Sequence, residues 1–323
     1  MFKWKKLGCV FNPADYPNRP NWMHEFAQAP HALELNDCLR VYFNCRPKPN
    51  EHGQYVSYCG FVDLDKDNLF KVLRISEQPV LPLGQLGTFD EFGTYPFSVV
   101  AHHNELLGYY GGWTRCASVP FDVAIGVARS TDGGLTFKKL GDGPVLSYSL
   151  HEPFVISGPK IRQFNNQLYL FYIAGKEWLL VNNKPEPVYK IRLATSHNGL
   201  DWDKHNSNLI TDLLGDNEAQ ASPDVIVENG LYHMFFCYRQ PTDFRHNKAR
   251  SYRIGYASSS DLMHWQRNDA RCGLDISESG FDSDMLAYPH VFKLNGKTYL
   301  FYLGNQVGRY GFGLAELEGE LTP

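Results

Sequence analysis

The stretch AYPHVFKLNGKTYLFYLGN, residues 287–305, has the pattern of a complete β-hairpin. A short alternating run follows Pro289, Asn295-Gly296 supplies a polar turn, and a second run rich in Tyr and Phe follows the turn. Proline is tolerated at the start of a strand because its missing N–H falls at the strand's end. The stretch therefore predicts two antiparallel strands.

Four other stretches of the chain align with this hairpin on a proline. They are QAPHALELNDCLRVYFNCR (28–46), TYPFSVVAHHNELLGYYGG (94–112), SGPKIRQFNNQLYLFYIAG (157–175) and ASPDVIVENGLYHMFFCYR (221–239). The prolines are Pro30, Pro96, Pro159, Pro223 and Pro289, separated by 66, 63, 64 and 66 residues. No linker or low-complexity segment interrupts the series. We therefore expect one repeat domain over residues 1–323.

Three of the units also contain a third strand, a tight turn and a fourth strand. These segments are IGVARSTDGGLTFKKL (125–140), IRLATSHNGLDWDKH (191–205) and IGYASSSDLMHWQR (254–267). Four antiparallel strands per unit around one axis predict an all-β, five-bladed β-propeller with inner strands starting near residues 30, 96, 159, 223 and 289. A parallel solenoid is the alternative, but its repeats are usually shorter and lack such hairpins.

The last unit ends at GRYGFGLAELEGELTP, where its fourth strand should begin. WKKLG at residues 4–8 matches FKKLG at residues 137–141, and Trp202 and Trp265 occupy the equivalent places in two other units. We expect the N-terminal strand to complete the last blade. This pairing would close the ring and cover a sheet edge that otherwise invites aggregation.

The composition excludes several classes of protein. Aromatic residues make up 14% of the chain, which favours strands, and the net charge of −4 gives no sign of a nucleic-acid or membrane partner. No apolar run approaches the ~18 residues of a membrane helix, and the N-terminal residues lack the pattern of a signal peptide. Seven cysteines without regular spacing or a C-x-x-C pair fit a reduced compartment, so we expect a cytoplasmic protein.

Acidic residues recur just before the predicted inner strands. Five positions before the prolines stand Glu25, Glu91, Phe154, Glu218 and Asp284; neighbouring residues add Asp90, Glu152, Asp216, Asp282, Gln28 and Gln220. In a propeller these positions open on one face near the axis, where close carboxylates push one another's pKa values apart and yield an acid and a base. The alternative is that each is a solvated loop residue. Clustered acids can hold calcium, but the spacing matches no known loop, so we expect no metal and no cofactor.

One cation per unit follows the second strand on the same predicted face. These cations are Arg46, Arg115, Lys176, Arg239 and Arg309. Guanidinium groups match carboxylate and phosphate bidentately, which predicts binding of an anionic group, whereas structural salt bridges with the acids are the alternative. Trp113 and Trp178 stand in the same loops and suit the apolar face of a sugar ring; His151, beside Glu152, is a further candidate.

These features resemble the five-bladed propeller glycosidases: the family 43 arabinanases and xylosidases, the invertases and levansucrases, and the family 130 mannoside phosphorylases and hydrolases. The likeness extends over the whole chain through the proline-led strands and the S-x-D-G-x-x-F/W turns. STDGGLTF (130–137) also looks like the Asp-box turn of sialidases, with Ser130, Asp132, Gly134 and Thr136 in place. The resemblance implies axial carboxylates that cleave a glycosidic bond in an inverting or a retaining geometry.

The chain departs from the arabinanase pattern, which places acids directly before or just ahead of some of the prolines. Here the residues directly before proline are Ala29, Tyr95, Gly158, Ser222 and Tyr288. The nearest match to the family's acid is Glu218, with Glu25 or the pair Asp90-Glu91 as base and Asp284 as a further candidate. We expect a hydrolase, inverting, acting on a carbohydrate or sugar conjugate with an acidic or phosphorylated group. A phosphorylase, a glycosyl transferase and a non-catalytic carbohydrate-binding propeller are the alternatives.

Overall fold

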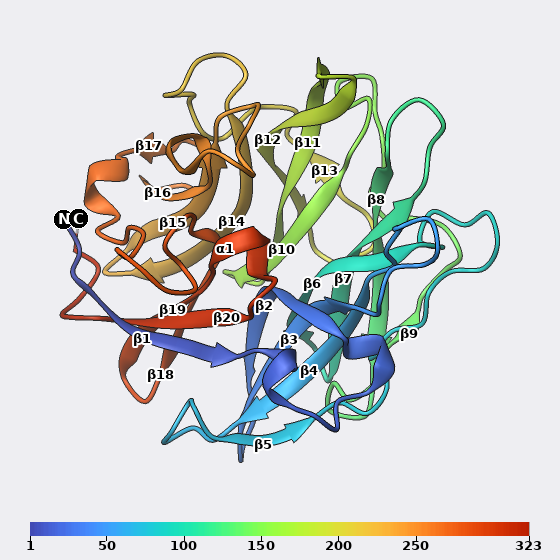
Figure 1. The fold of residues 1–323 in the computed structure, drawn as a ribbon. Helices are drawn as coiled ribbons and strands as arrows, with labels where there is room; N and C mark the ends of the chain where they lie inside the picture. Colours follow the sequence, from blue (N-terminus) through green and yellow to red (C-terminus); the bar gives the residue numbers. More distant parts are fainter. Residues whose placement is uncertain (323) are drawn as a thin grey trace.

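The computed structural model describes residues 1–322, and these form five four-stranded antiparallel sheets around a common axis (Figure 1). The predicted five-bladed propeller is confirmed, and the solenoid is excluded. Blade 1 contains β2 (Glu25–Glu34), β3 (Leu39–Arg46), β4 (Tyr58–Leu64) and β5 (Val72–Ile75). Blade 2 contains β6 (Gly93–His102), β7 (Glu105–Thr114), β8 (Asp122–Ser130) and β9 (Lys138–Lys139).

The other three blades follow the same order. Blade 3 contains β10 (Ser157–Phe164), β11 (Gln167–Val181), β12 (Lys184–Ser196) and β13 (Asp203–Lys204). Blade 4 contains β14 (Ala219–Glu228), β15 (Leu231–Arg239), β16 (Arg253–Ser259) and β17 (Gln266–Arg267). Blade 5 contains β18 (Ala287–Leu294), β19 (Lys297–Leu303), β20 (Phe312–Leu317) and β1 (Trp4–Phe11). Helical structure within residues 1–322 is limited to α1 (Asn305–Gly308) and the 3-10 turns Pro13–Asp15, Asn21–Met23, Lys248–Arg250 and Asp269–Arg271. In the same range no helix is long and apolar enough to span a membrane.

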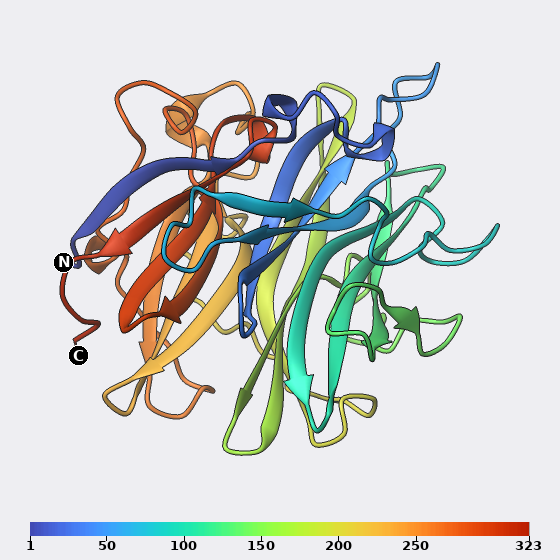
Figure 2. The same cartoon turned by 90° about the horizontal axis from the view of Figure 1, so that it is seen from below.

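The N-terminal strand closes the ring, as predicted. β1 pairs antiparallel with β20, with Trp4 opposite Leu317, and both ends of the chain lie on the same side of the molecule (Figures 1 and 2). The Trp4 ring packs edge-on against Phe235 of blade 4, with centroids 5.6 Å apart. Equivalent contacts join Trp265 to Phe171, Trp202 to Tyr109 and Phe137 to Tyr42. The repeated aromatic residue of the fourth strand therefore joins its blade to the preceding one.

A buried ion pair recurs in four blades, and we call it the clip. In each clip a cation of the fourth strand pairs with an acid from the segment before the inner strand. The four pairs are Lys139–Asp90, Lys204–Glu152, Arg267–Glu218 and Lys6–Asp282. In three of them a second-strand tyrosine hydroxyl also donates to the acid: Tyr110, Tyr172 and Tyr302. In these four blades the clip fastens the outer edge of the sheet to the segment before its inner strand.

Every inner strand carries a β-bulge at its proline. The register shifts between Gln28 and His31 in β2, and at the same place in the other four inner strands. The residue before proline takes a positive φ in Ala29 (49°), Ser222 (48°) and Tyr288 (50°), a conformation that costs a non-glycine residue about 1–2 kcal/mol. A bulge adds one residue on one strand and bends it. Each inner strand is thereby divided into a part before the proline and a part after it.

The clip in blade 5 gives a direct test of ring closure. Replacing Lys6 by Ala leaves the Asp282 carboxylate buried with only the Tyr302 hydroxyl, so we expect the free energy of unfolding to fall by about 1–3 kcal/mol. Lys5→Ala removes an exposed neighbour on the same strand and should change stability by less than ~0.5 kcal/mol. Urea denaturation of both variants measures the difference; equal stabilities would show that the clip does not hold the closing strand.

Candidate functional site

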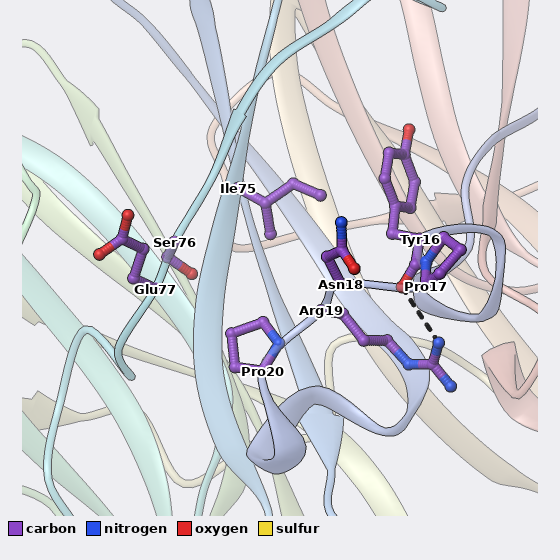
Figure 3. Close-up of a pocket in the computed structure, with 8 residues that line it drawn as sticks. All are labelled: Tyr16, Pro17, Asn18, Arg19, Pro20, Ile75, Ser76 and Glu77. Atoms are coloured by element: carbon purple, nitrogen blue, oxygen red, sulfur yellow. Dashed lines mark hydrogen bonds between the residues drawn. The ribbon is translucent and has the colours of Figure 1, made fainter.

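Two of the surface cavities among residues 1–322 contain no residue predicted from the sequence to act. The first, of about 260 Å³, lies between residues 16–20 and the end of β5, and Arg19 there donates to the Tyr16 carbonyl at 3.1 Å (Figure 3). The second, of about 490 Å³, lies beside the β6–β7 turn and residues 197–200. Because neither contains the predicted acids and cations, the candidate site must be sought among the residues at the axial face.

Three predicted site acids belong to clips. Asp90, Glu152 and Glu218 have at most 1% of their surface exposed, and each pairs with the cation of its own fourth strand. The Glu218 carboxylate also accepts hydrogen bonds from the backbone N–H groups of Leu213 and Leu214, both at 2.9 Å. A carboxylate saturated in this way has no lone pair left for a substrate. We therefore do not retain Glu218 or Asp90 as candidate catalytic groups, nor Glu152 as a ligand-binding one.

The two predicted glutamines are buried and serve as internal links. Gln220 donates from its amide to Glu218 at 3.1 Å and to Asp212 at 2.8 Å, so it belongs to the blade 4 clip. Gln28 donates to the Val307 carbonyl at 2.6 Å and thereby joins β2 to α1. Both arrangements hold elements together.

Three of the five predicted cations donate to backbone carbonyls. Arg239 is buried and donates to the carbonyls of Gln240, Pro241 and Pro187 and to the hydroxyls of Tyr252 and Tyr189. Lys176 is exposed and donates to the Asp216 carbonyl at 2.7 Å. Arg115 lies over the Phe92 ring at 4.0 Å and donates to the Tyr55 carbonyl at 3.1 Å. Arg239 is thus structural. Arg115 contacts the backbone of Tyr55, a residue of the blade 1 cluster defined in the next paragraph.

The structure brings Glu25, Arg46 and Arg309 together at the start of blade 1. The Glu25 carboxylate accepts from the Arg309 guanidinium at 2.8 Å and from the Tyr55 hydroxyl at 2.6 Å. Glu25 and Arg46 are register partners on β2 and β3, and the Arg46 guanidinium lies over the rings of Phe26 and Tyr55 at 4.6 and 5.3 Å. We call Glu25, Arg46, Tyr55 and Arg309 the blade 1 cluster. The hydrogen bond to Glu25 is the main cause that raises the pKa of Tyr55, so the phenol stays protonated.

Sequence reasoning missed Tyr55, which lies in the loop between β3 and β4. Nothing in the repeat marks that loop, since its length differs from blade to blade. Glu91, Asp284 and His151 lie in three separate interblade loops; the Glu91 carboxylate accepts from the Gly87 N–H at 2.9 Å, and the other two are exposed. The structure does not gather these three around Glu25.

Tyrosines stand directly before the prolines of blades 2 and 5. Tyr95 and Tyr288 stand directly before their prolines with ring centroids 6.2 Å apart, and Tyr288 faces Tyr252 at 6.3 Å. Burial raises the pKa of Tyr95 and Tyr288 well above the ordinary value, so both present neutral hydroxyls. The axial end of the inner strands thus offers hydrogen-bonding phenols.

An aromatic row continues from the axis across blades 2 and 3. Trp113 lies 5.8 Å from Tyr95 and 4.4 Å from Phe121, and Phe121 lies 5.3 Å from Trp178. Trp178 in turn contacts Phe154 at 6.0 Å. Trp113, Phe121, Trp178 and Phe154 are all half-buried, so each keeps part of its ring on the surface. The two predicted tryptophans therefore lie in one continuous surface strip.

A buried polar network closes the axis beneath the tyrosines. It consists of residues that follow the prolines: His31, Lys160, Arg162, Asp224 and His290. Asp224 pairs with Arg162 and with His290, both at 2.7 Å, and the two histidine rings lie 4.6 Å apart. Although burial acts to raise it, the charges of Arg162 and Lys160 and the hydrogen bond from His290 hold the pKa of Asp224 well below its usual range. The residue directly after proline is titratable in four blades, a signal that sequence reasoning passed over.

The hydrogen bonds assign both histidines as neutral. His290 Nε2 accepts from the Ala32 N–H at 2.8 Å, so its proton is on Nδ1, which donates to Asp224. His31 Nε2 lies 2.8 Å from the Val99 carbonyl and must donate, which leaves Nδ1 to accept from the Ser98 hydroxyl. Burial lowers the pKa of His290 to about 3, against the opposing effect of Asp224, and burial lowers the pKa of Lys160 to about 8.

The axial network predicts a defined pH response. Because the His290 pKa is lowered in the folded state and is ~6.5 in the unfolded chain, the folded state loses stability as the pH falls from about 6.5 towards 3. We expect the His290 imidazole to remain neutral, with its proton on Nδ1, at pH 5. Nitrogen-15 chemical shifts, assigned with a His290→Gln variant, measure this; titration of the ring near pH 6.5 would refute the buried network.

Within residues 1–322 no group of three His, Cys, Asp or Glu side chains is arranged to hold a metal ion. None of the seven cysteines, all of which lie in that range, forms a disulfide.

Two proteins of Mycobacterium tuberculosis are similar in sequence over almost the whole chain. Uncharacterized protein Rv1502, of strain H37Rv, is 33% identical over 316 residues, which cover 98% of this chain and 99% of the relative. Uncharacterized protein MT1551, of strain CDC 1551, matches with the same values. The chain belongs to their family. No family model matches the sequence.

Solved structures of glycoside hydrolases share the five-bladed propeller fold of this chain. A structure named simply as a glycoside hydrolase has a TM-score of 0.75 at 16% identity, covering 99% of this chain and 93% of its own length. A thermostable family-43 glycoside hydrolase has a TM-score of 0.65 at 14% identity, with coverages of 94% and 90%. A structure from the GH130 family of mannoside phosphorylases has a TM-score of 0.68 at 14% identity, with coverages of 100% and 96%. At these identities the likeness establishes the fold, and the resemblance predicted from the sequence is confirmed at that level.

Proposed function

We propose that the protein is a carbohydrate-active enzyme of the glycosidase type that acts at the tyrosine-lined end of its axis. The observation that carries the proposal is the blade 1 cluster, in which Glu25 is the one predicted axial acid outside a clip that touches other site groups within residues 1–322. Its side chain is 15% exposed, so it is reachable yet held in place. The fold shared with glycoside hydrolases supports this interpretation.

The aromatic row supplies the surface on which a sugar would bind. The apolar face of a pyranose ring packs on an indole, and Trp113 and Trp178 are spaced along the row by Phe121. The Trp113 N–H is already donated to the Tyr95 carbonyl, which fixes the indole plane beside the axis. A sugar chain bound on this strip would have its end near Tyr95 and Tyr288.

Glu25 is the group we assign to proton transfer. Its carboxylate lies between a cation, Arg309, and a neutral phenol, Tyr55. The Tyr55 hydroxyl shares a hydrogen bond with that carboxylate, so a proton received at Glu25 can be returned through the same pair. Arg309 donates to that carboxylate at 2.8 Å and thereby orients it. In this assignment Arg46 and Tyr55 position the substrate.

The cytoplasmic location expected from the sequence remains a prediction.

A non-catalytic carbohydrate-binding propeller is the second candidate. It is favoured by the clips, which use Asp90, Glu152 and Glu218 and leave Glu25 without a second free carboxylate of the predicted set beside it. In that case Glu25 would only accept hydrogen bonds from sugar hydroxyls. A phosphorylase differs from a hydrolase in using phosphate as the attacking group, and assays with and without phosphate separate these two.

Replacing Glu25 by Gln tests the assignment. We expect turnover of the best aryl glycoside in a panel to fall by about 10²–10⁴-fold, because the amide cannot take up a proton, while sugar affinity changes only a few-fold. Glu105→Gln, which changes a surface acid paired with Arg129, is the matched control and should keep wild-type rates. Kinetics give the turnover and calorimetry the affinity. Absence of turnover in the wild type, together with unchanged sugar binding in Glu25→Gln, would favour the binding protein instead.

A further inference from the structure

Arg46 is a cation whose Nε atom is buried and has no hydrogen-bond acceptor among residues 1–322. Its guanidinium carbon lies over the rings of Phe26 and Tyr55, 4.6 and 5.3 Å from their centroids, and the two rings are nearly perpendicular to each other. Glu25 lies opposite in register, but its two oxygens already accept from Tyr55 and Arg309. Burial lowers the pKa of Arg46, although the group stays charged because an arginine side chain does not deprotonate in proteins.

Other arginines of the interior have clear partners. Arg40 makes two bonds to Asp63, at 2.7 and 2.9 Å, and Arg239 uses all three of its nitrogens. Arg192 also has unpartnered nitrogens, but the Glu152 carboxylate lies 3.8 Å from it and balances its charge. Desolvating a charge without a partner costs free energy, so an unpartnered buried guanidinium nitrogen points to a missing acceptor.

Unpartnered polar atoms lie close to Arg46 on the same strand. Asn44 stands two residues earlier on β3, so both side chains leave the same face. The Asn44 amide donates to the Thr94 carbonyl at 2.8 Å, which leaves the Asn44 Oδ1 buried without a donor. The Thr94 hydroxyl is also buried and unpartnered. Asn44 and Thr94 are fully buried, so the unpartnered polar atoms of this junction between blades 1 and 2 lie in the interior.

The charges around Arg46 favour an anion. Two guanidinium groups adjoin a single carboxylate, since Arg309 donates to Glu25 and Arg46 is the register partner of Glu25. Two guanidinium groups beside one acid leave a local excess of positive charge. The aromatic rings over Arg46 exclude water and strengthen any charge-assisted hydrogen bond formed there.

We propose that Arg46 binds an oxyanion, a carboxylate or a phosphate ester, that is carried by the sugar ligand. The inference rests on the proposed function only in taking the ligand to be a sugar. The Arg46 fork receives two oxygens of the anion, and Arg309 and the hydroxyls of Tyr95 and Tyr288 lie around the ring that bears it. Arg46 thereby selects acidic sugars over neutral ones.

Calorimetric titration tests this with four ligands: glucuronic acid, glucose 6-phosphate, glucose and inorganic phosphate. We expect at least one acidic sugar to bind the wild type about tenfold or more tighter than glucose, the contribution of a charge-assisted hydrogen bond. Arg46→Met should remove this preference, Arg46→Lys should retain part of it, and Arg129→Met, an arginine at the opposite end of blade 2, should leave it unchanged. Thermal unfolding without ligand should place Arg46→Met at or above the wild-type Tm, because an unpaired buried charge is removed.

Three results would overturn the proposal: an acidic-sugar preference that survives in Arg46→Met, a loss of ligand-free Tm in both Arg46 variants, or inorganic phosphate binding as tightly as glucose 6-phosphate. The last result would assign the anion to a free co-substrate. Arg46-dependent binding of an acidic sugar in a protein without turnover would support the anion site while rejecting the enzymatic function. Loss of turnover in Glu25→Gln, with no preference of the wild type for acidic sugars, would support the enzymatic function while rejecting the anion site.

Discussion

The bulge before each proline is the constraint on which the rest of the structure depends. It inserts one extra residue into every inner strand where the five strands meet, and in three of them a non-glycine residue takes the left-handed conformation there. Side chains before the bulge reach the tyrosine-lined end of the axis, and those after it enter the buried network of Asp224, His290 and Lys160. The same bulge thus separates the buried polar network on the axis from the tyrosine-lined end of the axis.

The candidate site lies in the blade where the repeat is broken. Blades 2 to 5 use the acid before the inner strand in a clip, but blade 1 fastens its fourth strand through Arg74 and Asp63 within β4 and β5. Glu25 stands at the same distance before its proline as Glu218, the acid of the blade 4 clip, but it pairs instead with Tyr55 and Arg309. A carboxylate freed in one blade of a symmetric scaffold is a physical reason to look for function there.

The fold could be predicted from the sequence because a hairpin repeated at a constant spacing admits few architectures, and WKKLG identified the strand that closes the ring. The site could be predicted only in part. Glu25 contacts Arg309 and is in register with Arg46, and Trp113 and Trp178 are joined through Phe121, while a common site for all five stays a prediction. Glu218 and Asp90 were expected there as well. Their position in the repeat predicts where each acid lies along the chain, but it does not show which cation pairs with it. The partners were visible in principle, because Lys6, Lys139, Lys204 and Arg267 occupy one position of the fourth-strand motif. Tyr55, from an irregular loop, follows no pattern in the repeat.

A crystal structure of the protein soaked with selenate tests the central claim most directly, because anomalous scattering from selenium locates an oxyanion without bias. The account predicts a peak beside Arg46, with an anion oxygen about 2.7–2.9 Å from its Nε atom. An empty Arg46 guanidinium bonded only to water or protein, with selenate bound at other arginines, would contradict it.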